Sequence, residues 1–260
     1  MNWNELLETK SIWINLVVYG YLFIFGACLG SFSMLVGFRV PRNETLLGRS
    51  HCESCDEKLG AVELIPIFSY LFLKGKCRHC KKNIGWWYPL FEIISGAVFS
   101  ATFYLWGFSK ETIIALTLFI LLWMITVSDI TSHKIPNNIL LPFAIIGLVE
   151  RLLLAQFHYW WYPFVGMFVG LITLYLLRIS HRSKKGMGFG DIKLFAVLGI
   201  YLGPILALFS LVAAAIIGIV FTIIVFVSKN KKLKSVPFGP FAGMGAWLIY
   251  LLSFVFKWNF

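Results

Sequence analysis

Long apolar runs separated by short polar segments dominate the chain. About 20 apolar residues are needed to cross the hydrocarbon core of a membrane as an α-helix. Runs of this kind are found at residues 11–38, 89–106, 112–128, 138–154, 160–177, 191–202, 205–228 and 241–256. They lack the two-residue alternation of a transmembrane β-barrel. The pattern therefore predicts an all-α polytopic membrane protein with about eight transmembrane helices.

The sixth of these runs is short. Gly203-Pro204 interrupts it after twelve residues, and proline disrupts the interior of a helix. We expect this segment to start at the aqueous edge, to tilt, or to break.

Composition supports a membrane protein. Hydrophobic residues make up 59% of the 260 residues and charged residues only 13%, with a mean hydropathy of +0.80. A soluble domain of this size could not cover its surface with so few charges. The run at 11–38 is too long for the core of a signal peptide, so we expect it to remain as the first span. The lipid bilayer is the first predicted partner.

The basic residues predict the topology. Cytoplasmic loops of membrane proteins collect Lys and Arg. Placing the segment after the first span inside puts nineteen of the 23 Lys and Arg residues at the cytoplasmic face and both termini outside. The net charge of +11 is therefore interpreted as a topology signal, and no nucleic-acid partner is predicted.

The segment 39–88 is the longest predicted loop, and it contains four cysteines in two C-x2-C pairs. Cys52 and Cys55 are separated by 21 residues from Cys77 and Cys80, close to the spacing of zinc ribbons. Disulfides are the alternative, but they rarely persist in a reducing cytoplasm. Four thiolates leave no open coordination position, so we predict a structural Zn²⁺ ion that staples the loop.

Three other histidine and cysteine residues receive less specific interpretations. His51 and His79 could replace a cysteine ligand, but we expect both to be surface residues. Cys28, inside the first span, is expected to be a small buried apolar side chain.

Two aspartates lie at the edges of apolar runs. Asp129 ends the run at 112–128 and precedes Ile135-Pro136-Asn137, whereas Asp191 follows Gly188-Phe189-Gly190 and opens the next run. A carboxylate at a membrane edge is costly and usually functional. The predicted topology places both at the cytoplasmic ends of helices. Two such acids indicate an aspartyl protease, in which one carboxyl group holds a proton while the other activates water.

Each acid has a structural alternative. A carboxylate at a helix start, as at Asp191, is stabilised by roughly 0.3–1 kcal/mol through the helix dipole. Asp129 closes its helix, where the dipole disfavours it, so Asp129 is the more informative acid. Glu150 beside Arg151 is expected to form a surface pair at the outer end of a span.

Other classes of function remain open at this point. A transporter with intramembrane acidic ion-coupling residues is one alternative, although such proteins favour acids near the bilayer midplane. A non-catalytic assembly factor that binds a partner through the cysteine loop is another. A general intramembrane protease of signal peptides would not explain the cysteines.

Several motifs together resemble those of the type IV prepilin peptidases, including the competence members that process pseudopilins. They are Gly30-Ser31-Phe32, Arg39-Val40-Pro41, the cysteine pairs, Ile65-Pro66, Ser69-Tyr70-Leu71, Tyr88-Pro89-Leu90-Phe91-Glu92, Asp129 with Ile135-Pro136-Asn137, Gly188-Phe189-Gly190-Asp191-Ile192-Lys193, and Pro237-Phe238-Gly239-Pro240-Phe241. The chain departs from the family at Met34, where members commonly have Asn.

The resemblance implies a membrane-embedded aspartyl endopeptidase with Asp129 and Asp191 as catalytic residues. Gly188, Gly190, Lys193 and Pro136 would support the motifs. The implied substrates are prepilins or pseudopilins, cut after a glycine at the end of a short basic leader on the cytoplasmic side of a bacterial membrane.

Many family members also methylate the new N-terminus with S-adenosylmethionine, an activity that the resemblance assigns to the first cytoplasmic region. The segment 39–88 has no glycine-rich nucleotide-binding loop, and its S-adenosylmethionine-binding residues are not identified. The expected organisation is a first transmembrane helix at 1–38, a zinc loop and methyltransferase region at 39–88, and a peptidase bundle at 89–260.

Overall fold

The computed structural model describes residues 12–52, 54–154, 159–180, 188–229 and 236–256. Both termini, predicted to lie on the outer side of the membrane, are outside this part of the chain. So are the basic segments 181–187 and 230–235.

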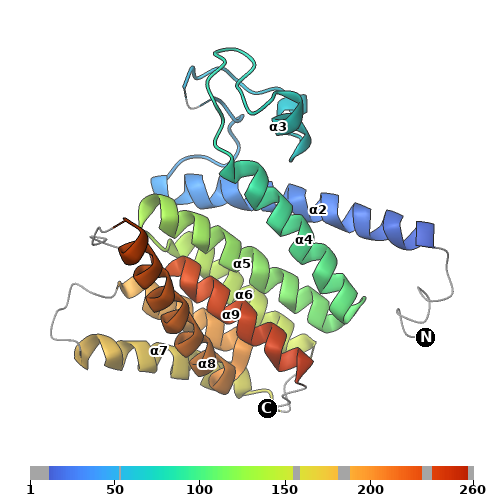
Figure 1. The fold of residues 1–260 in the computed structure, drawn as a ribbon. Coiled ribbons are helices and arrows are strands. Elements are labelled where there is room, and N and C mark those ends of the chain that lie inside the picture. Colours follow the sequence, from blue (N-terminus) through green and yellow to red (C-terminus); the bar gives the residue numbers. More distant parts are fainter. Residues whose placement is uncertain (1–11, 53, 155–158, 181–187, 230–235, 257–260) are drawn as a thin grey trace. The chain divides into compact units, whose positions relative to one another are not determined.

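The regular structure of the described residues is helical (Figure 1). The helices are α2 Ile12–Arg39, α3 Phe68–Phe72, α4 Trp87–Trp106, α5 Lys110–Ser132, α6 Asn137–Leu153, α7 Tyr162–Ser180, α8 Phe189–Lys229 and α9 Gly239–Val255. Five of them, α2, α4, α5, α7 and α8, are long and apolar enough to cross a membrane, and α9 is a shorter apolar helix. The prediction of an all-α polytopic membrane protein is confirmed, whereas the count of eight spans stays a prediction.

Helix α8 is broken where the sequence indicates. Its 41 residues would extend about 62 Å if straight, roughly twice the thickness of the hydrocarbon core. Gly203 has φ 76° and ψ 174°, outside the helical region, a conformation that glycine adopts readily. Pro204 follows without an N–H donor. The segments before and after this break correspond to the sixth and seventh predicted runs.

The chain forms two compact units. The first contains residues 1–39 and 44–116, and the second contains residues 40–43 and 117–260.

In the first unit α2 and α4 cross at close range. A Cβ atom added to Gly26 would lie 2.5 Å from Phe99 Cβ, and one added to Gly30 would lie 2.4 Å from Ser95 Cβ. The Ser95 hydroxyl donates to the backbone carbonyl of Gly26 at 2.8 Å. Small residues permit such close packing of membrane helices.

Cys28 lies on the exposed surface of α2. The expectation that it is buried is wrong, because the neighbouring Ala27 faces inward and consecutive helical residues point in different directions.

In the second unit α7 and the first part of α8 are in backbone contact. A Cβ atom on Gly166 would lie 2.1 Å from the carbonyl oxygen of Gly199, and one on Gly170 would lie 2.2 Å from that of Phe195. Because α7 lacks side chains at both points and α8 lacks one at Gly199, the segment of α8 that carries Asp191 lies directly against α7.

Candidate functional site

Asp129 lies in the last turn of α5, which continues to Ser132. Its side chain is buried, with 7% of its surface exposed. The backbone N–H of Gly239, at the start of α9, donates to Asp129 Oδ2 at 2.6 Å. A Cβ atom on Gly239 would lie 2.9 Å from both Cβ and Oδ2 of Asp129. Only glycine therefore allows α9 to approach the acid this closely.

Asp191 lies in the first turn of α8. Its Oδ2 accepts the backbone N–H of Gly188 at 3.1 Å, so the side chain caps the helix start as well as carrying a favourable dipole interaction. Gly190 packs against the segment that follows α5, because an added Cβ atom would lie 2.9 Å from Ile135 Cβ.

Two further contacts hold the starts of α6, α8 and α9 around the two acids. Lys193 Nζ donates to Oδ1 of Asn137, the first residue of α6, at 3.0 Å. One turn after Asp191, the ring of Phe195 stacks on Phe238 with centroids 6.1 Å apart. Phe238 immediately precedes the glycine that bonds Asp129.

The structure thus brings Asp129 and Asp191 to one site, within the range of direct electrostatic interaction. The residues predicted to support the motifs surround them: Gly188 and Gly190 beside Asp191, Lys193 on the same helix, and Pro136 as the extended residue before α6. The acids are separated by 61 residues in sequence. Contacts of α8 with α6 and with Phe238, and the hydrogen bond from Gly239 to Asp129, bring them together.

The direct contact of Gly239 with Asp129 was not predicted from the sequence. The segment Pro237-Phe238-Gly239-Pro240 carried only a family resemblance. A glycine between two prolines, at the start of an apolar run, was the available signal for a close backbone approach.

The four cysteines also come together. The Sγ atoms of Cys52, Cys55, Cys77 and Cys80 all lie within 4.8 Å of one another, and those of Cys52 and Cys80 are 3.9 Å apart. Tetrahedral coordination at a metal–sulfur distance of about 2.3 Å requires sulfur atoms about 3.8 Å apart. All four are free thiols, so the cluster could hold a metal ion.

The two cysteine pairs have the same backbone design. The N–H of Cys52 donates to the carbonyl of Glu57 at 2.9 Å, and the N–H of Cys77 donates to that of Lys82 at 2.9 Å. Backbone N–H groups of Ser54 and Cys55 point at the Cys52 sulfur and lower the pKa of that thiol to about 7. Those of Cys80 and His79 likewise lower the pKa of Cys77. These hydrogen bonds favour the thiolate form, which binds metals, at Cys52 and Cys77. At Cys55, a hydrogen bond from the Glu57 N–H lowers the pKa of the thiol, but burial and the neighbouring thiols outweigh it and raise this pKa to about 12.

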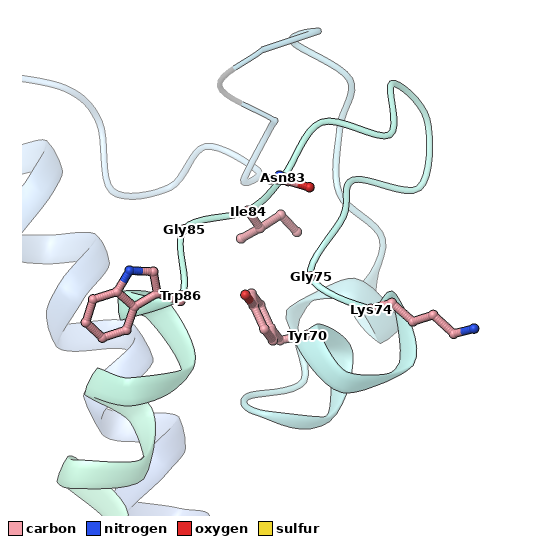
Figure 2. A pocket seen from close by; sticks show the side chains of 7 residues that line it. All are labelled: Tyr70, Lys74, Gly75, Asn83, Ile84, Gly85 and Trp86. Carbon is pink, nitrogen blue, oxygen red and sulfur yellow. The ribbon is translucent and has the colours of Figure 1, made fainter.

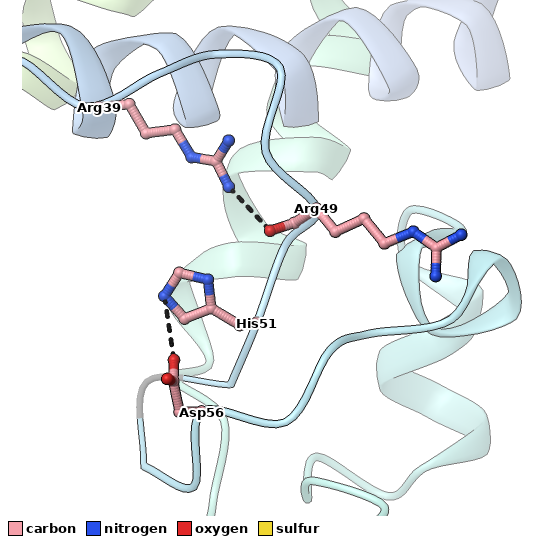
Figure 3. A network of polar contacts seen from close by, with 4 residues as sticks. All are labelled: Arg39, Arg49, His51 and Asp56. Atoms are coloured by element: carbon pink, nitrogen blue, oxygen red, sulfur yellow. Dashed lines mark hydrogen bonds and ion pairs between the residues drawn. The ribbon is translucent and has the colours of Figure 1, made fainter.

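Hydrogen bonds around Arg39 connect the cysteine loop to the end of α2. Arg39 Nη1 donates to the carbonyl oxygens of Thr45 and Gly48 at 3.1 and 2.9 Å, and Nη2 donates to that of Arg49 at 3.4 Å. Figure 3 shows Arg39 reaching Arg49, with His51 beside Asp56 further along the loop. His51 and His79 are exposed, as predicted, and His51 Nε2 lies 3.6 Å from Asp56 Oδ1.

A cavity of about 350 Å³ lies beside α3 in the same unit. It is lined by Tyr70, Lys74, Gly75, Asn83, Ile84, Gly85 and Trp86. The rings of Tyr70 and Trp86 lie on either side of Gly85, and the Lys74 ammonium extends away from both rings (Figure 2).

Comparison with known proteins gives two adjacent family matches. The bacterial peptidase A24 N-terminal domain matches residues 24–106, and the type IV leader peptidase family matches residues 115–223. No solved structure matches the chain.

The curated relatives that match include several named prepilin leader peptidase/N-methyltransferase. The Bacillus subtilis protein is 36% identical, over 88% of this chain and 92% of its own length. The Aeromonas hydrophila protein is 31% identical, over 83% of this chain and 75% of its own length. The Neisseria gonorrhoeae protein is 30% identical, over 87% of this chain and 88% of its own length. The chain therefore belongs to the type IV leader peptidase family.

Proposed function

We propose that this protein is a membrane-embedded aspartyl endopeptidase that removes the short basic leader of prepilins or pseudopilins after a glycine. Asp129 and Asp191 are its catalytic residues. The observation that carries the proposal is the convergence of these two carboxyl groups through Gly239, Ile135 and Asn137. Family membership and the relatives' names support it, and they leave the transporter alternative without support.

The proposed chemistry is that of a carboxyl pair. Two neighbouring carboxyl groups cannot easily both ionise, so one retains a proton. The ionised partner takes a proton from water as the water oxygen attacks the scissile carbonyl carbon. The protonated partner donates to the carbonyl oxygen, and proton transfer to the leaving nitrogen completes hydrolysis. The backbone N–H of Gly239 holds the Asp129 side chain in place. The backbone N–H of Gly188 and the dipole of α8 do the same for Asp191.

We place the site at the cytoplasmic face of a bacterial membrane, with both termini outside. The excess of Lys and Arg in the segments assigned to the inside supports this orientation. The leader of a prepilin would reach the acids from that side, where its basic residues remain in water and its apolar helix enters the bilayer.

We propose Zn²⁺ as the ion of the four-cysteine cluster. The sulfur separations fit a tetrahedral site. Four thiolate ligands leave no open coordination position, which is typical of a structural zinc ion. Cys52, Cys55, Cys77 and Cys80 would hold it, stabilising segment 39–88.

The relatives' names also support methyl transfer to the new N-terminus as a second activity of the first unit. Its methyl donor would be S-adenosylmethionine, which supplies an electrophilic methyl group when bound. The cavity beside α3 has a volume in the range of small-molecule sites, and its lining includes the aromatic residues Tyr70 and Trp86. We propose these two residues as its contacts.

The test uses membranes containing the full chain and a prepilin, with product mass as the readout. We expect loss of the leader mass with wild type, and an added methyl group when S-adenosylmethionine is supplied. Asp129→Asn and Asp191→Asn should each abolish leader removal. Asp56→Asn is the matched control, because Asp56 is 91% exposed at φ 57°, where Asn is tolerated.

Substantial leader removal by either site variant would overturn the two-acid mechanism. Absence of cleavage by wild type, with the protein folded and the leader accessible, would overturn the proposed substrate.

A further inference from the structure

Two consecutive charged residues, Glu150 and Arg151, lie near the C-terminal end of α6. Arg151 has only 6% of its surface exposed, so the expectation of a surface pair with Glu150 is wrong for this residue. Burial follows from packing that the sequence does not display, because Arg151 faces α8. Ionisable side chains within membrane helices usually face the bundle interior and carry a function.

The two residues contact different helices. Glu150 Oε2 accepts the hydroxyl of Thr117, on α5, at 2.8 Å. Arg151 Nη2 donates to the backbone carbonyl of Tyr201, on α8. Thus adjacent residues of α6 connect the helix that carries Asp129 with the helix that carries Asp191.

The contact with α8 is made just before its break. Tyr201 lies two residues before Gly203, and carbonyl groups in the last turn of a helix need donors other than their own helix. Arg151 supplies such a donor. The carbonyl therefore gives Arg151 a fixed attachment point on this segment of α8.

Tyr201 is held against α6 in two further ways. Its hydroxyl donates to the carbonyl of Phe143 at 2.9 Å, and the whole side chain is buried. Its ring fits only because Gly147 lacks a side chain, since an added Cβ atom would lie 2.4 Å from Tyr201 Cζ. The lateral position of α8 on α6 is therefore fixed at this level.

The distances along the helices match. From Thr117 to Asp129 is twelve residues of α5, about 18 Å, and from Tyr201 back to Asp191 is ten residues of α8, about 15 Å. The contacts of Glu150 and Arg151 thus lie at similar distances from both acids. At the opposite end of α6, Asn137 bonds Lys193, so α8 is attached to α6 at two levels.

We propose that Glu150 and Arg151 are positioning residues for the hydrolysis, which set the relative heights of α5 and α8 and so align Asp129 with Asp191. The inference rests on the proposed function, in which both acids act on one water molecule. Sliding one helix against the other would separate the two carboxyl groups, which act in the chemical step.

The test measures kcat and KM for prepilin cleavage by the full chain, together with the folded fraction. Arg151→Met removes the guanidinium group and keeps an apolar stem, whereas Thr117→Val removes the hydroxyl that donates to Glu150. Because misplacing reacting groups by about 1 Å can cost about 100-fold in rate, we expect Arg151→Met to lower kcat about 10- to 100-fold at unchanged KM. Thr117→Val should lower kcat less, and Arg151→Lys should recover part of the loss.

The matched control is Thr222→Val, whose hydroxyl donates only within its own helix to Gly218 at 2.7 Å, and it should keep wild-type kcat. Wild-type kcat per folded molecule in Arg151→Met would overturn the proposal. If that variant does not fold, the same criterion applied to Thr117→Val decides. Failure of the proposed function is separate, since it would appear as absence of cleavage by wild type or as activity of Asp129→Asn.

Discussion

Replacing Gly239 with alanine tests the contact between α9 and Asp129. The added Cβ atom would lie 2.9 Å from Cβ and Oδ2 of Asp129, at least 0.5 Å closer than the 3.4 Å at which ordinary van der Waals contact begins. Backbone strain does not contribute, because Gly239 is not among the described glycines with positive φ. The aspartate or the start of α9 must therefore move.

The displacement also lengthens the hydrogen bond from the Gly239 N–H, now 2.6 Å. A hydrogen bond to a charged group contributes about 1.5–3 kcal/mol, and about 1.4 kcal/mol corresponds to tenfold in rate. We therefore expect Gly239→Ala to lower kcat about 10- to 100-fold while the zinc content stays unchanged.

The assay is single-turnover cleavage of a prepilin by purified enzyme, with the leader peptide quantified by mass. Gly218→Ala is the matched control, because its added Cβ atom would meet Phe241 at an ordinary 3.5 Å. Wild-type cleavage by Gly239→Ala would refute the reasoning that the start of α9 positions Asp129.

Two further predictions concern the metal cluster and helix packing. Cys52→Ser should reduce bound zinc, measured by atomic emission, and lower the melting temperature of the first unit. The control Cys28→Ser should change neither. Stoichiometric zinc in Cys52→Ser would contradict the four-cysteine assignment. Gly166→Ala should destabilise the second unit by about 1–3 kcal/mol or more, the typical cost of overpacking, because its Cβ atom would lie 2.1 Å from the Gly199 carbonyl oxygen. An unchanged melting temperature in detergent would contradict the observed backbone contact.

The helices could be predicted closely because the bilayer fixes the length of an apolar run. The run at 112–128 became α5, Lys110–Ser132, because polar residues at each end continue the helix beyond the apolar run. Asp129 consequently lies one turn before the helix end. There, Thr131 satisfies its hydroxyl by donating to the Val127 carbonyl at 2.8 Å.

Asp129, Asp191 and the four cysteines could also be singled out from the sequence. A carboxylate at a membrane edge is energetically costly, and two C-x2-C pairs at this spacing are typical of a metal site. The contacts that hold functional side chains in place depend on tertiary packing, which cannot be read from the hydrophobic periodicity of the sequence. The N–H of Gly239 reaches Asp129 across 110 residues, and Arg151 reaches the Tyr201 carbonyl across 50. The Arg151 contact leaves no local pattern in the sequence, and the Gly239 contact leaves only a glycine between two prolines.

Cleavage rates of Asp129→Asn, Asp191→Asn and the double variant, measured on one prepilin with equal amounts of folded enzyme, test the central claim most directly. Residues that act as a unit show strongly non-additive losses. We predict that each single variant loses leader removal completely and that the double variant is no worse. A single variant that still cuts the leader, or losses that multiply in the double variant, would contradict a shared catalytic site.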